Sequence, residues 1–110
     1  MHREILEADW KLFRRLQPLA LERFCRCVLD DIARLLLSAD SKRNSHERYL
    51  AVCKLIRQRD EELADSFDNP RRSTAFVQLA RIRAEGLLTE EEFAGFSSET
   101  RAAVQVFLDG

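Results

Sequence analysis

The stretch SHERYLAVCKLIRQRDEELADSF, residues 45–67, decides how this chain folds, because it has the pattern of one uninterrupted amphipathic helix. Its apolar residues recur at intervals of three and four, which places them on one face of a helix from about His46 to Phe67. Ser45 is suited to cap the N-terminus, and Pro70 bounds the far end. The apolar face consists of Tyr49, Cys53, Ile56, Leu63 and Phe67.

One acidic residue interrupts this face. Asp60 falls near its middle, where an apolar side chain is expected. An isolated carboxylate is costly in a helical core, so the pattern predicts a cation, hydrogen-bond donors, water or a ligand beside it. Either Asp60 forms a salt bridge or cap with Arg71, Arg72 or Arg83, or it lines a polar pocket.

The composition favours a single all-α domain. A chain of 110 residues corresponds to one domain, 1–110, and can bury a core without disulfides or a structural metal. Three glycines and two prolines leave few turn signals, which favours a few long helices over strands. We therefore predict a compact bundle of five to six helices around the long helix at about 46–67.

Further helices are expected on both sides of this central one. Pro18 either begins a helix or kinks a single long one. Gly86 is placed to end a helix, and Thr89 and Glu92 form a capping box that opens the next. The expected ranges are about 3–16, 18–37, 70–85, 89–96 and 98–108.

The first expected helix carries apolar residues on two faces. One face consists of Leu6, Trp10 and Phe13. The surplus apolar positions, which begin nearly opposite and continue past Pro18, are Ile5, Leu12, Leu16 and Leu19. A helix with two apolar faces needs two partners, so it either lies between other helices or contacts a second copy of the chain. The surplus favours self-association through these four residues.

Charge and hydropathy exclude several classes of protein. A net charge of −1 argues against nucleic-acid binding, which depends on neutralising phosphates. No apolar run has the length of a secretory signal core or a membrane span. Three cysteines without an export signal predict reduced thiols and a cytoplasmic location.

The sequence holds little catalytic equipment. Cys25 and Cys27 would point about 200° apart on a helix and could not bind one metal ion together. Cysteines on apolar stripes are instead expected to pack in the core. Gly-rich phosphate loops and Glu-x-x-His pairs are absent, and nothing marks a nucleophile or base. We expect no enzyme, no metal and no cofactor.

The stretch NPRRST, residues 69–74, is a second candidate site. Free amides at a helix N-terminus together with Arg71 and Arg72 would suit a phosphate or carboxylate. Alternatively, these arginines pair with the acidic block at 60–68. A helix-turn-helix at 76–96 would begin its second helix with Thr-Glu-Glu-Glu, which phosphate repels.

The stretch IRAEGLLTEEEF, Ile82 to Phe93, resembles the helical hairpin of short C-terminal bundling domains in bacterial proteins. The likeness covers about a tenth of the chain, and any capped hairpin would use its Gly-apolar-apolar-Thr-Glu core, so it assigns no family. We expect a small bacterial protein that is not an enzyme, acts through protein–protein contact and self-associates. The alternative is a small-ligand or anion-binding domain that uses Asp60 with Arg71 and Arg72.

Overall fold

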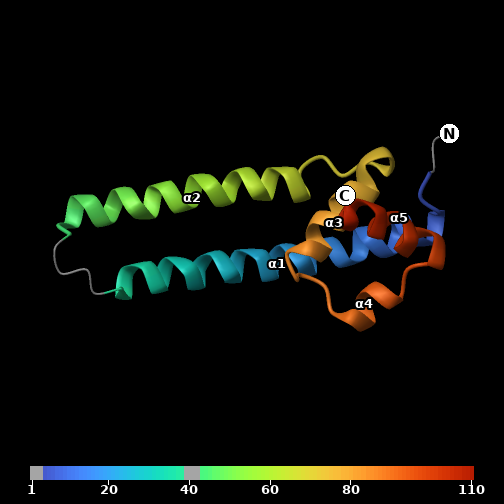
Figure 1. Ribbon diagram of the computed structural model, residues 1–110, viewed down its shortest axis with the longest axis horizontal. Helices are drawn as coiled ribbons and strands as arrows, with labels where there is room; N and C mark the ends of the chain where they lie inside the picture. Colours follow the sequence, from blue (N-terminus) through green and yellow to red (C-terminus); the bar gives the residue numbers. More distant parts are fainter. Residues whose placement is uncertain (1–3, 39–42) are drawn as a thin grey trace.

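The computed structural model describes residues 4–38 and 43–110 and shows an all-α chain (Figure 1). Within these ranges there is no strand, and a single turn of 3-10 helix, Arg72–Thr74, precedes the third α-helix. The predicted all-α fold is confirmed. The helices are α1 (Glu7–Leu37), α2 (Ser45–Phe67), α3 (Ala75–Ala84), α4 (Glu90–Ala94) and α5 (Ser98–Asp109).

The helices differ greatly in length, and this sets the shape. α1 and α2 have 31 and 23 residues and lie side by side as an antiparallel hairpin (Figure 1). α3, α4 and α5 have 10, 5 and 12 residues and gather around the end where α1 begins. The molecule is therefore 55 Å long and only 26 and 24 Å across. We call the protruding part of the hairpin, residues 25–38 and 43–60, the arm, and the remainder the head.

α1 continues through Pro18 as one helix. A proline inside a helix leaves the carbonyl four residues earlier, here that of Arg14, without its usual donor. Both Pro18 and Arg14 are exposed, so water can hydrogen-bond to this carbonyl. Of the two alternatives for Pro18, the structure shows the single helix.

The core lies in the head, where α1, α3 and α5 meet. Its largest fully buried apolar side chains are Phe13, Leu79, Ile82, Phe96 and Val104. The C-terminal end of α2 joins this core through Phe67, whose ring packs edge-on against Phe24 with 5.8 Å between centroids. The head thus holds the two long helices together at one end only.

A buried carboxylate, Asp9, ties the first helix to the last. Asp9 is 4% exposed and accepts hydrogen bonds from the Ser97 amide (2.9 Å), the Ser97 hydroxyl (2.5 Å) and the Thr100 hydroxyl (2.6 Å). It lies in the first turn of α1, and Ser97 is the N-cap of α5, so partial positive charge from two helix ends surrounds it. Burial alone would raise the pKa of Asp9, but the hydrogen bonds from Ser97 and Thr100 outweigh burial and hold it below its ordinary value.

The turn between α3 and α4 has the predicted glycine stop and the predicted capping box. Gly86 has φ 72°, and the Leu87 amide donates to the Ile82 carbonyl, as in the usual glycine C-terminal motif. Thr89 and Glu92 form the predicted capping box.

Asn44, not Ser45, caps α2, since its side chain accepts from the Glu47 amide. The helix expected from Pro70 begins only at Ala75. Asn69 adopts φ 52°, a left-handed conformation that asparagine tolerates, and therefore turns the chain away after α2 instead of opening the next helix.

Arg23 of α1 fastens this turn to the first helix. Its guanidinium donates to both carboxylate oxygens of Glu92 (2.6 and 3.0 Å) and to the Leu87 carbonyl (2.9 Å). These hydrogen bonds from Arg23, with the Thr89 amide, lower the pKa of Glu92 to about 2. The same carboxylate therefore caps α4 and binds it to α1.

Asp9→Asn is expected to lower the free energy of unfolding by about 1–3 kcal/mol, because an amide cannot accept all three hydrogen bonds as a carboxylate does. Urea titration at neutral pH measures the change. Asp30→Asn, at an exposed carboxylate of the same helix, is the control and should shift the midpoint little. Equal effects of the two substitutions would contradict the role given to Asp9.

Glu92 should make the stability of the fold depend on acid pH. Its folded pKa of about 2 lies below its ordinary value of 4.5, so its contribution is full above pH 4.5 and is lost as the pH falls toward 2. Glu92→Gln should cost about 3 kcal/mol near neutral pH and much less near pH 2. Urea unfolding at both pH values tests this, with the exposed Glu99→Gln as control. A cost that does not change with pH would contradict it.

Candidate functional site

The prediction that Asp60 faces the core is wrong. Asp60 is exposed, and no hydrogen bond or ion pair to its carboxylate is found within residues 4–38 and 43–110. The side of α2 that meets α1 carries Val52 and Arg59 instead, which are half-buried. The predicted apolar stripe of α2 exists, but between Tyr49 and Asp60 it lies beside the contact with α1 and remains largely uncovered.

The two arginines predicted to act with Asp60 have other surroundings. Arg72 pairs with Glu7 of α1, and its guanidinium lies 5.8 Å from the centre of the Trp10 ring. Arg71 borders a shallow groove of about 460 Å³ between the end of α2 and α3, and neither Asp60 nor Arg72 is among the residues that line it. The structure therefore does not bring Asp60, Arg71 and Arg72 together in one site.

The interface predicted on the first helix is mostly covered by the head. Ile5 is 4% exposed, and Leu12 and Leu16 are half-buried against the core. Leu12 packs so closely on Gly95 that a Cβ added there would lie 3.2 Å from its Cδ2 atom. Only Leu19 of the four predicted residues is exposed, so the head supplies the second partner that this helix needs.

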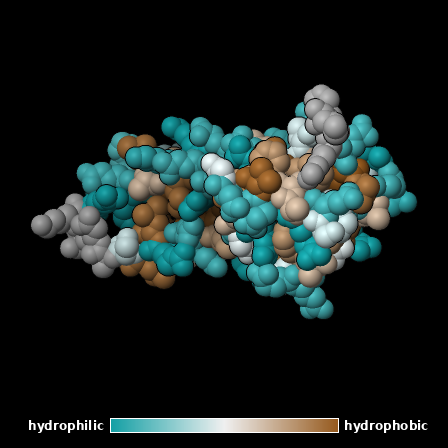
Figure 2. Space-filling view, turned by 45° about the vertical axis from the view of Figure 1, so that its right-hand side comes forward, coloured by the Kyte–Doolittle hydropathy of each residue, from teal (hydrophilic) through white to brown (hydrophobic). Residues whose placement is uncertain are grey.

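Large apolar side chains are exposed on the arm as well as on the head, where Val106 is 70% and Phe107 is 50% exposed. Leu29 and Tyr49 are each 65% exposed, Leu36 is 45% exposed and Ile56 is 40% exposed. Figure 2 shows hydrophobic side chains gathered along the arm between hydrophilic margins. Large apolar side chains this close together on a surface are typical of a contact site for another protein.

The arm has two opposite faces, and the positions of its residues along each helix show which side chains belong to which face. One face borders shallow grooves, whose lining includes Cys27, Asp31 and Arg34 of α1, Ser38 at its C-cap, Ala51, Leu55 and Gln58 of α2, and Glu62 just beyond the arm. The other face is shifted by two residues on each helix, about 200° around it. It consists of Cys25, Leu29, Ile32 and Leu36 of α1 with Tyr49, Cys53, Ile56 and Asp60 of α2. We call it the apolar face; both of its quartets have the spacing 4, 3, 4.

Polar contacts fix how the two arm helices meet. Arg59 of α2 donates to Asp31 of α1 at 3.0 Å and also binds Glu62 of its own helix at 3.0 Å. The pKa of Glu85, nearby in the head, is raised by burial and by the carboxylate of Glu62. Because the Arg59 guanidinium is held by both acids, Asp31 and Arg59 set the register of the hairpin.

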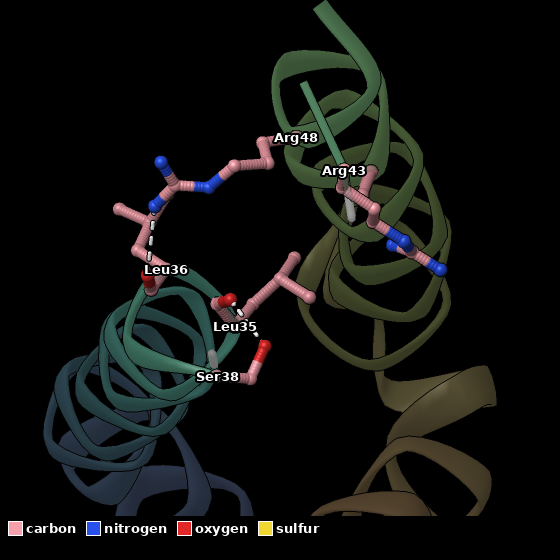
Figure 3. Close-up of a pocket in the computed structure, with 6 residues that line it drawn as sticks. Leu35, Leu36, Ser38, Arg43 and Arg48 are labelled. Carbon is pink, nitrogen blue, oxygen red and sulfur yellow. Dashed lines mark hydrogen bonds between the residues drawn. The ribbon is translucent and has the colours of Figure 1, made fainter. Parts of the chain in front are cut away.

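Near the tip of the arm, among the described residues, a side chain of α2 binds the end of α1. Arg48 of α2 reaches across and donates to the Leu36 carbonyl at 2.8 Å, which satisfies one of the free carbonyls at the end of α1 (Figure 3). The Ser38 hydroxyl donates to the Leu35 carbonyl at 2.8 Å. The cavity between these groups has about 20 Å³, enough for about one water molecule.

The cysteines are free thiols distributed over both faces of the arm. Cys25 and Cys53 are half-buried on the apolar face, where Cys53 forms a hydrogen bond that raises the pKa of Tyr49. Cys27 is exposed. In the described part of the chain, no three His, Cys, Asp or Glu side chains are grouped as a metal would require.

Comparisons with known proteins give no further guidance: no family model, curated protein or solved structure matches this chain. Among residues 4–38 and 43–110, no helix has the length and hydropathy needed to cross a membrane. The arm therefore has to be interpreted from its own geometry.

Proposed function

We propose that this chain is a non-enzymatic protein that acts through protein–protein contact and associates with itself through the apolar face of the arm. The observation that carries the proposal is the exposure of Leu29, Leu36, Tyr49 and Ile56 on one side of a two-helix hairpin. Two such hairpins packed face to face make a four-helix bundle, in which each apolar stripe is covered.

The energetics are consistent with a moderate dimer. Burying a large apolar side chain contributes about 1.5–3 kcal/mol relative to leaving it exposed, and these side chains are already about half covered. Eight of them in a dimer contribute on the order of 10 kcal/mol before the loss of translational and rotational freedom is subtracted. If that loss is about 4 kcal/mol, about 6 kcal/mol remains, so we expect a dissociation constant of roughly 10–100 µM.

The small-ligand alternative has less support, because the proposed residues Asp60, Arg71 and Arg72 do not share one groove. A bundle formed with the helices of a different protein would use the same apolar face. Self-association is preferred, because the α2 stripe carries a hydrogen-bond acceptor, Asp60, at one end and a donor, Tyr49, at the other, and two identical copies can join these ends.

Sedimentation velocity over a concentration series from about 1 to 300 µM should show a reversible monomer–dimer equilibrium. Ile56→Lys should raise the dissociation constant at least about tenfold, since it places a charge in the apolar face. Val106→Lys is the matched control, because Val106 is 70% exposed but belongs to the head. A monomer throughout the series, or equal effects of the two lysines, would refute self-association through the arm.

A further inference from the structure

Resting on the proposed self-association, we infer that the two arms pair antiparallel and that Asp60 of each copy accepts a hydrogen bond from the Tyr49 hydroxyl of the other copy. Asp60 is the one acidic residue of the apolar face. It is the last residue of the α2 quartet and lies at the end nearer the head, whereas Tyr49 is the first and lies near the tip of the arm.

The spacing of both quartets is palindromic. Reading the α1 quartet backwards exchanges Cys25 with Leu36 and Leu29 with Ile32. Reading the α2 quartet backwards exchanges Tyr49 with Asp60 and Cys53 with Ile56. The two copies can be related by a two-fold axis that lies in the interface and is perpendicular to the arm helices. Such an axis packs each helix against the same helix of the other copy in the opposite direction, so each quartet meets its own reverse.

Both quartets also span the same length of the arm, so one axis serves both. Arg48 contacts the Leu36 carbonyl at the tip, and Arg59 contacts Asp31 further down. The first contact agrees to within one residue with a pairing of positions 49–60 of α2 with positions 36–25 of α1, and the second, made by the long side chain of Arg59, departs from that pairing by five residues. The midpoints of the two quartets therefore lie within about 8 Å of one another along the arm, and a symmetric face-to-face pair requires them to be close.

In the antiparallel pair, the polar groups at the two ends of the α2 quartet meet. Cys25 then faces Leu36, and Leu29 faces Ile32 of the second copy. Asp60 faces Tyr49, whose hydroxyl donates to the carboxylate, and a hydrogen bond to an ionised group is stronger than a neutral one.

The parallel pair, with both tips at the same end, gives poorer contacts. Each α1 would then lie on α2 of the other copy, so Asp60 would face Cys25 and Tyr49 would face Leu36. The carboxylate would lose water without gaining a strong donor, which is costly. In each copy the short helices gather at one end of the hairpin (Figure 1). Both heads would therefore crowd at one end of the parallel pair, whereas the antiparallel pair places them at opposite ends.

A double-mutant cycle on the dimer dissociation constant tests this pairing, with the full chain in reducing buffer. Tyr49→Phe should raise the dissociation constant about tenfold, because it leaves two carboxylates without a donor. Adding Asp60→Leu to Tyr49→Phe should return the constant to within about threefold of the wild-type value, because both polar partners are then replaced by apolar groups. A Tyr49→Phe effect of the same size with and without Asp60→Leu would overturn the pairing.

Disulfide cross-linking gives a second readout that does not depend on energies. In a background where Cys25, Cys27 and Cys53 are changed to Ala, a mixture of the single variants Tyr49→Cys and Asp60→Cys should give mainly the mixed dimer on mild oxidation. With only Cys25 retained, Asp60→Cys should not cross-link efficiently; efficient cross-linking there would show the parallel pair. A chain that dimerises with either contrary result overturns the antiparallel pairing alone, whereas a monomer overturns the proposed function as well.

Discussion

The mismatch between two long helices and three short ones determines the rest of this structure. α1 is about 46 Å long at 1.5 Å per residue, whereas α3 spans about 15 Å. The short helices can therefore enclose only the head, and the far half of the hairpin has one neighbour for each helix. An amphipathic helix of this width needs more cover than a single neighbour provides, so part of its apolar stripe stays exposed.

The head compensates with contacts that connect residues far apart in the chain. Asp9 joins the starts of α1 and α5, and Arg23 joins α1 to the capping box of α4. The arm has no comparable buried contact. Its helices are aligned by the half-exposed pair of Arg59 and Asp31, and contacts of that kind contribute about 1 kcal/mol or less. A second copy packed on the apolar face would supply the cohesion that the isolated arm lacks.

Much of the fold could be predicted from the sequence because local rules govern it. The all-α class, the extent of α2, the stop at Gly86 and the capping box of Thr89 and Glu92 all follow from spacing and turn chemistry. What covers each stripe depends on tertiary packing, which the spacing does not encode. Asp60 was singled out because it interrupts an apolar stripe, and Asp9 does so too. Asp9 lies four residues from both Ile5 and Phe13, on a stripe that is buried in the structure. Only the arrangement of the short helices distinguishes the two carboxylates.

The candidate interface was misplaced for the same reason. Ile5, Leu12 and Leu16 have the spacing of a contact surface, and the head covers them. Leu29, Leu36, Tyr49 and Ile56 have the spacing of core residues, and within the described residues they stay 40–65% exposed. The expected helix lengths could have predicted this exposed surface, because the last three expected helices are together too short to enclose both long ones.

The central claim is that the apolar face of the arm is a contact between two copies, and hydrogen–deuterium exchange compared at low and high protein concentration tests it most directly. The account predicts that slower exchange at high concentration is concentrated in residues 25–36 and 49–60, while the amides of α3 to α5 change little. Exchange that does not depend on concentration, or added protection confined to the head, would contradict it.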